Sequence, residues 1–220
     1  MLWIANQREP AEFREWRRQN AKGVNYSYDA LPGDVKRAVR AALLKDQRYL
    51  CAYTMKKIWE VRSHIEHFLP QSTHPESYLD YHNMLACYPG DREGMVPYGA
   101  TYKKDSDVDI LNPHDPNVDG EFRYSSNGEI IGKSEPARRT IEVLNLNHEQ
   151  LCADRKNIMQ RWRKRLYGTK SGVAKCRKMM ADYESSDRLP EYYGVIRQVL
   201  SDYAKHQEKR AQRLSREKRQ

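Results

Sequence analysis

The middle third of the chain, residues 48–134, consists of short apolar runs separated by turn-forming residues. Short runs bounded by proline, glycine, asparagine and serine favour strands and loops. The predicted strands are 49–53, 61–68 and the two arms of a hairpin at 122–131. Asn127-Gly128 supplies the turn of that hairpin. The segment 81–88 fits either a short helix or a strand. This region therefore limits the chain to small sheets.

Both flanks of this region carry helical patterns. Residues 10–20 place a proline in the first turn of a helix, and Asp34 is a candidate N-cap of a second helix. The last third is helical, and Pro190 opens its final helix. We expect an α+β, mostly helical protein. Its expected segments are an N-terminal helical segment at 1–47, a central region at 48–134, a basic helical region at 135–204 and a basic tail at 205–220.

The composition excludes two classes of protein. Charged residues make up 31% of the 220 residues, mean hydropathy is −0.97, and no run approaches the ~20 apolar residues of a spanning helix. The 15 tyrosines and 4 tryptophans provide core-forming material, which excludes disorder throughout. The start of the chain lacks the apolar stretch of a signal peptide. We expect a soluble, cytoplasmic protein whose four widely spaced cysteines are reduced.

Positive charge is concentrated late in the chain. The formal net charge is +9, and the span 155–178 holds ten basic residues and no acid. This pattern favours a polyphosphate partner, because each neutralised phosphate releases counterions. The candidate phosphate contacts are Arg161, Arg163, Lys164 and Arg165, and Trp162 and Tyr167 are candidates for stacking on bases. The alternative is a solvated helix face, which is the favoured interpretation for the tail at 205–220.

Four of the seven histidines lie close together, namely His64, His67, His74 and His82, with Glu66, Asp80 and Asn83 among them. If 63–68 is extended, His64 and Glu66 share one face and His67 points to the other. A carboxylate suits Mg²⁺ or Mn²⁺, and a histidine can remove a proton from water near neutral pH. The alternative is that these histidines are loop and surface residues beside an aromatic cluster.

The sequence Glu66-His67-Phe68-x-Pro70, followed by Asn83-x-Leu85 and Cys87, resembles the HNH (ββα-metal) endonuclease motif. Within that family the chain is most similar to the PtuB-like proteins of Septu and retron anti-phage systems, over roughly residues 48–165. The other segments that carry this resemblance are Cys51–Tyr53, Asp80–Leu85, Leu111–Pro113, the hairpin at 122–128 and Ala137–Asn147.

The resemblance implies a small ββα-metal core within 48–134 and a role for each site residue. His67 would be the general base, Asn83 would orient His67 through a hydrogen bond, and Glu66 would hold one divalent metal. That metal is expected to be Mg²⁺ or Mn²⁺, with Zn²⁺ as the alternative. His64 would be a second ligand or a phosphate contact. The remaining expectations concern the helix near 98–105, where Asp105 is the best oxygen donor for the metal and Lys103 and Lys104 are candidate contacts to nucleic acid.

The same resemblance implies a function and partners. The chain would be a metal-dependent endonuclease acting on DNA or RNA, and the effector of an anti-phage complex with a PtuA-like ATPase subunit. A retron-linked form would add a reverse transcriptase and its RNA–DNA product. Cys51-Ala-Tyr-Thr54 stands where related proteins often have two cysteines, so no structural zinc is expected. The competing function is a non-catalytic, basic nucleic-acid-binding adaptor with a degenerate HNH site.

Overall fold

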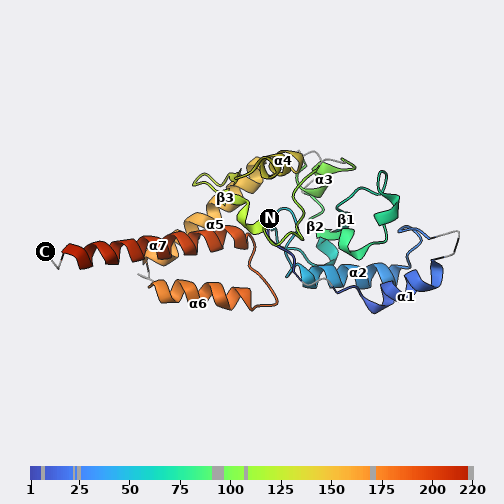
Figure 1. Cartoon of the computed structure of the whole chain (residues 1–220), viewed down its shortest axis with the longest axis horizontal. Coiled ribbons are helices and arrows are strands. Elements are labelled where there is room, and N and C mark those ends of the chain that lie inside the picture. The colour runs from blue at the N-terminus through green and yellow to red at the C-terminus, as the bar shows by residue number, and fades with distance from the viewer. Residues whose placement is uncertain are drawn as a thin grey trace.

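The computed structural model describes residues 1–5, 8–21, 23, 26–90, 97–106, 109–168 and 172–217. These residues form an elongated α+β molecule that is mostly helical, as the sequence predicts (Figure 1). The helices are α1 (Ala11–Asn20), α2 (Gly33–Asp46), α3 (Ala100–Lys103), α4 (Glu135–Val143), α5 (Glu149–Gly168), α6 (Val173–Glu184) and α7 (Tyr193–Glu217). The strands are β1 (His64–His67), β2 (Met84–Cys87), β3 (Phe122–Tyr124) and β4 (Ile130–Gly132).

Strands β1 and β2 form an antiparallel pair at one end of the molecule. Their register aligns His64 with Cys87 and His67 with Met84. Every residue of β2 is buried, because α2 packs against that strand. The two strands thus present residues of β1, rather than residues of β2, toward the protein surface.

The prediction of a strand at 49–53 was wrong. This segment is a buried turn that makes one bridge, between Leu50 and Lys57. Arg48 and Tyr49 have positive φ angles of 53° and 63°, which interrupt extended backbone. The predicted strand at 61–68 is shorter than expected, because a 3₁₀ turn occupies Glu60–Arg62. The ambiguous segment 81–88 contains both structures, a 3₁₀ turn followed by β2.

Strands β3 and β4 form the predicted hairpin, and α4 packs against β4. Gly128 in its turn has a φ angle of +92°. The carbonyl of Gly128 accepts a hydrogen bond of 2.6 Å from Nε of Arg155, which lies on α5. This bond fastens the hairpin turn to the long helix behind it.

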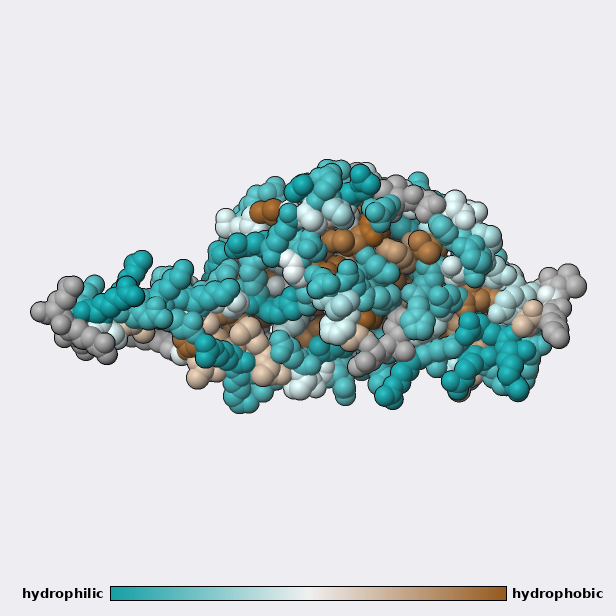
Figure 2. All heavy atoms as spheres, viewed as in Figure 1, coloured by the Kyte–Doolittle hydropathy of each residue, from teal (hydrophilic) through white to brown (hydrophobic). Residues whose placement is uncertain are grey.

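Helices α5, α6 and α7 form a bundle at the other end of the molecule (Figure 1). The Tyr192 hydroxyl donates to Asp154, and the ring of Tyr167 meets that of Tyr203, so α5 and α7 run in the same direction. Helix α7 continues through Glu217, so the described part of the predicted tail belongs to the same helix. The distal half of α7 extends beyond the bundle, and its own surface side chains are mostly hydrophilic (Figure 2).

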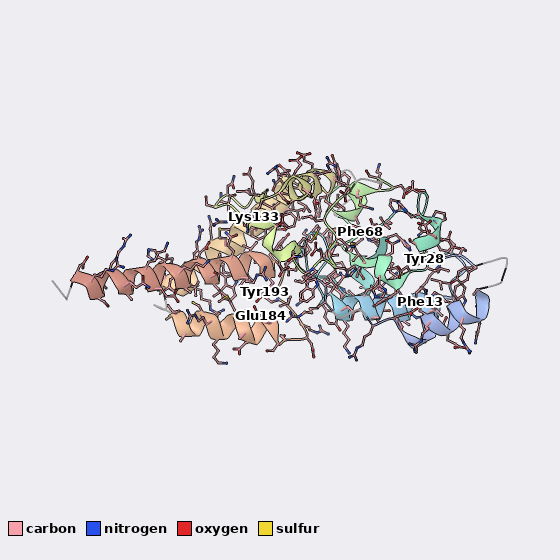
Figure 3. The ribbon with its side chains drawn as sticks, in the orientation of Figure 1. Phe13, Tyr28, Phe68, Lys133, Glu184 and Tyr193 are labelled. Atoms are coloured by element: carbon pink, nitrogen blue, oxygen red, sulfur yellow. The ribbon has the colours of Figure 1, made fainter. Side chains whose placement is uncertain are left out.

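Arg48 joins the two ends of the molecule. Arg48 lies just after the end of α2. Its guanidinium donates hydrogen bonds to carbonyl oxygens at and just beyond the end of α6, on Tyr183, Glu184 and Ser186. Carbonyls at the end of a helix lack the full set of helical hydrogen bonds, and the arginine gives these an additional donor. Figure 3 shows Glu184 and Tyr193 at this junction. Within the described ranges, no helix combines the length and the apolar character that crossing a membrane requires.

Candidate active site

The end of β1 holds His67 and Glu66 next to each other. Side chains alternate along a strand, so the two groups leave β1 on different sides. Glu66 lies opposite Leu85, and His67 lies opposite Met84 at the last paired position. The backbone then turns into the loop at 69–80, which returns to β2. His67 therefore contacts this loop, whereas Glu66 contacts α3.

Both ring nitrogens of His67 have a hydrogen-bond partner. Nε2 lies 2.9 Å from the carbonyl oxygen of Tyr78, and Nδ1 lies 2.8 Å from Nε2 of Gln71. A carbonyl only accepts, so Nε2 of His67 carries the proton and Nδ1 keeps its lone pair. Burial and the charge of Lys103 lower the pKa of His67, against the opposing effect of the Tyr78 carbonyl. The ring is thus neutral at pH 7, with a defined basic nitrogen.

Two side chains cover the His67 ring. His67 as a whole is only 7% exposed, and the ring of Tyr28 meets its ring edge-on with centroids 4.8 Å apart. Figure 3 shows Tyr28 and Phe68 at this end of the molecule. Gln71 is an exposed residue of the loop, and its amide occupies the direction of the Nδ1 lone pair. Rotation of the Gln71 side chain into solvent would expose that nitrogen.

The predicted hydrogen bond from Asn83 to His67 was wrong. The Asn83 amide instead pairs with backbone groups, accepting from Leu69 N at 2.7 Å and donating to the carbonyls of Leu69 and Ser77 at 3.1 Å. These bonds close the loop that presents the Tyr78 carbonyl to His67. The asparagine therefore acts on the histidine indirectly, through the loop.

Replacing Asn83 with alanine is expected to lower the free energy of unfolding by about 2 kcal/mol or more, because it removes the amide that pairs with the backbone N–H and carbonyl of Leu69. Urea denaturation followed by circular dichroism measures this change. A loss below about 0.5 kcal/mol would contradict the role given to Asn83. Replacing His82 with alanine is the control, because its side chain lies next to this loop and is exposed.

The Glu66 carboxylate lies between a buried lysine and a half-exposed histidine. Its Oε1 is 3.3 Å from Nζ of Lys103, and its Oε2 is 3.9 Å from Nε2 of His64. Burial raises the pKa of Glu66 to about 7, although Lys103 favours the charged form. Burial and the charge of Arg40 lower the pKa of His64. Two groups therefore face each other on the side away from Lys103: the Oε2 atom of Glu66 and the neutral imidazole of His64. Both could bind a metal ion.

This pair is compatible with a weakly held divalent ion. A separation of 3.9 Å lets one ion sit about 2.1 Å from both Glu66 Oε2 and His64 Nε2, with water or substrate oxygens as its other ligands. Among the described residues, no group of three or more His, Cys, Asp or Glu side chains could hold a metal ion. Asp105 does not join Glu66 and His64 in such a group, and its role as a ligand stays a prediction. Asp105 is exposed and acts on Glu66 only through its charge.

The prediction that Lys103 contacts nucleic acid was also wrong. Its side chain is only 1% exposed and points inward from α3 to Glu66 and to the carbonyl of His67. The neighbouring Lys104 is exposed, so it stays a candidate phosphate contact. The other predicted histidines lie apart from this group: His74 contacts Glu76, and His82 contacts Asp80.

The basic residues of α5 divide into exposed and buried sets. The predicted phosphate contacts Arg161, Arg163, Lys164 and Arg165 are all exposed, as is Tyr167. Trp162 is only 8% exposed and packs against Tyr183, so its prediction as a base-stacking residue was wrong. Arg155 is 2% exposed and donates a hydrogen bond to the turn of the hairpin at Gly128. Arg177 and Lys178 pair with Glu208 and Asp182. Lys170, Lys218 and Arg219 lie outside the described residues.

Sequence reasoning missed four contacts around His67 and Glu66. The Tyr78 carbonyl carries no sequence signal, because any residue supplies one. Tyr28 and Gln71 lie in irregular segments without periodicity. The inward direction of Lys103 was missed because lysine is rarely buried. Its position on the helix that follows the two strands was the one available signal.

Comparison with known proteins gives no match, either to a family model or to a curated protein.

Proposed function

We propose that this protein is an HNH-type endonuclease that hydrolyses phosphodiester bonds in DNA or RNA. One observation carries the proposal: the Tyr78 carbonyl fixes the proton of His67 on Nε2, which leaves Nδ1 as the basic nitrogen. The resemblance of the chain to the HNH motif supports it. The test is nicking of supercoiled DNA and of labelled RNA by the purified protein, with Mg²⁺ or Mn²⁺ and with a chelator.

In this proposal His67 takes a proton from the attacking water. Gln71 first rotates into solvent, and water takes its place at Nδ1. The Tyr78 carbonyl then stabilises the protonated ring, because its bond to Nε2–H becomes charge-assisted. General-base catalysis of this kind contributes roughly 10²–10⁴-fold to a rate. Asn83 contributes by holding the loop that carries Tyr78.

Glu66 and His64 are the residues that would hold a divalent ion, Mg²⁺ or Mn²⁺, with Zn²⁺ as the alternative. When bound, such an ion neutralises charge on the phosphate and stabilises the leaving oxygen. Glu66 contributes the only carboxylate of the pair, and the neutral His64 ring contributes a nitrogen. This proposal includes no structural zinc.

The exposed basic face of α5 is the proposed nucleic-acid contact. Arg161, Arg163, Lys164 and Arg165 lie on a helix without a nearby acid in the sequence, and Arg165 stacks on Trp162 with its guanidinium 5.0 Å from the ring centroid. Contacts to phosphates do not depend on the base sequence. This face of α5 would therefore contribute to the affinity for nucleic acid rather than to sequence specificity.

Replacing Arg161, Arg163 and Arg165 with glutamine is expected to weaken nucleic-acid binding and to reduce its salt dependence. The slope of log affinity against log salt should fall by roughly 0.9 for each lost duplex phosphate contact. Fluorescence anisotropy over a salt series measures both quantities. Arg138 and Arg139 on α4, both exposed, give the matched control when changed to glutamine. An unchanged slope in the α5 variant would exclude this face as the contact.

A second candidate function is a non-catalytic nucleic-acid-binding adaptor. The burial of His67 and the ion pair between Lys103 and Glu66 favour it, since both groups already have protein partners. The two functions differ in one measurement. The adaptor binds nucleic acid through α5 and releases no cleaved product with any divalent ion.

The resemblance to PtuB-like proteins supports a proposal about partners. The chain would act as the effector of an anti-phage complex with an ATPase subunit, and a retron-linked form would add a reverse transcriptase and its RNA–DNA product. Co-expression with the neighbouring gene products, followed by purification of the complex, tests this assignment.

A further inference from the structure

Lys103 places a positive charge inside the candidate active site. It is the last residue of α3, the helix that follows β2, and its side chain is 1% exposed. Its Nζ lies 3.3 Å from Glu66 Oε1 and 3.3 Å from the carbonyl oxygen of His67. The ammonium therefore contacts the backbone of one site residue and the carboxylate of the other.

Lys103 and Glu66 depend on each other electrostatically. An ammonium removed from water requires a nearby negative charge, and Glu66 supplies it at contact distance. The Glu66 side chain is itself only 15% exposed, so water screens the pair weakly. One oxygen of the carboxylate thus contacts the ammonium, while the other faces His64.

We infer that Lys103 is a built-in counter-ion of the candidate metal site, which keeps the affinity of that site for a free divalent cation low. This inference rests on the metal site of the proposed function. The cation can use only Glu66 Oε2 and His64 Nε2. It also experiences repulsion from the ammonium across the carboxylate.

This arrangement predicts when the metal binds. A divalent ion held by two protein atoms takes its other ligands from water or from a substrate phosphate. A phosphodiester adds negative charge next to the ion and offsets the repulsion from Lys103. The protein therefore takes up its cation mainly together with nucleic acid.

The test measures Mn²⁺ binding by the full chain at pH 8, without nucleic acid, by electron paramagnetic resonance of the free ion. Replacing Lys103 with methionine should lower the Kd for Mn²⁺ by roughly tenfold or more, because it removes the repulsion and frees Oε1. The matched control is Lys104→Met, one residue further along and exposed, which should change the Kd by less than about twofold.

Two results would overturn the inference. One is an unchanged Kd in a folded Lys103→Met protein. The other is a gain in affinity that survives in the double variant Lys103→Met with Glu66→Gln, because the gain must come from this carboxylate. Circular dichroism verifies folding, and Lys103→Gln, which keeps a hydrogen-bond donor, replaces methionine if that variant does not fold.

The failure of this inference is distinct from the failure of the proposed nuclease function. The Mn²⁺ titration contains no substrate and reads no cleavage. Tighter binding by Lys103→Met, together with no cleavage by the unmodified protein, would uphold the counter-ion and reject the nuclease. Cleavage that requires Mn²⁺, with no change of Kd in Lys103→Met, would do the reverse.

Discussion

Replacing His67 with alanine is expected to reduce phosphodiester cleavage by roughly 10²–10⁴-fold while leaving nucleic-acid affinity unchanged. The variant removes the nitrogen that accepts the proton from water. It leaves the exposed arginines of α5 in place. Nicking of supercoiled DNA measures cleavage, and fluorescence anisotropy measures binding on the same preparations.

Two further variants make this result specific. His67→Gln keeps a donor for the Tyr78 carbonyl and most of the packing against Tyr28, but has no base at neutral pH. It should be as inactive as His67→Ala. His82→Ala removes an exposed histidine and should cleave normally. Equal cleavage by all three variants would assign the activity to other groups or to a contaminant.

Replacing Gly128 with alanine is expected to cause the largest loss of stability, about 3 kcal/mol or more in the free energy of unfolding. The residue has a φ angle of +92°, and a Cβ atom there would lie 2.0 Å from the carbonyl oxygen of Cys152. The atoms that it would strike belong to the backbone of α5, which cannot move without breaking the bond from Arg155 to Gly128.

Urea denaturation followed by circular dichroism tests this expectation. Gly120→Ala is the matched control, because a Cβ at Gly120 meets no atom within 4 Å. Its stability should stay within about 0.5 kcal/mol of the original protein. A Gly128→Ala protein as stable as this control would mean that the hairpin does not approach α5 closely in solution.

Local signals predicted most of the helices and the hairpin of β3 and β4. Pro10 marks the start of α1, and Asn127-Gly128 marks the turn between β3 and β4. Helix α2 begins at Gly33 with Pro32 as its N-cap, so the prediction of Asp34 as the N-cap was wrong, and Asp34 lies in the first turn. The prediction of a strand at 49–53 was wrong because the aromatic and apolar residues of this segment are buried in a turn. Positive φ angles at non-glycine residues have no clear sequence signal, so the turn could not be foreseen.

The alternation of side chains in β1 predicted one half of the candidate site. His64 and Glu66 do lie on one face, 3.9 Å apart, as the spacing requires. The other half depends on α3, a single turn whose direction follows from its tertiary contacts. One turn has too few residues to show a periodicity, so sequence could not decide between Lys103 and Asp105 as the inward residue.

Helical phase could have corrected the predictions for α5. Its buried residues are Leu151, Arg155, Met159, Trp162 and Leu166. They recur at intervals of three and four, which is one face of a helix. Arg155 and Trp162 lie on that face, so both belong to the inner set. The exposed residues Arg161, Arg163 and Arg165 lie outside it.

The two sets of residues that the proposed nuclease would use for binding and for cleavage lie in different parts of the molecule. The exposed arginines lie on α5, within the bundle, whereas His67 and Glu66 lie beside β1 toward the opposite tip (Figure 1). Helix α7 alone has 25 residues, which corresponds to about 37 Å, or roughly eleven base pairs of duplex. In the proposed nuclease, a strand bound by the exposed arginines of α5 would be cut at a distance from those arginines, so binding time and turnover could evolve through different residues.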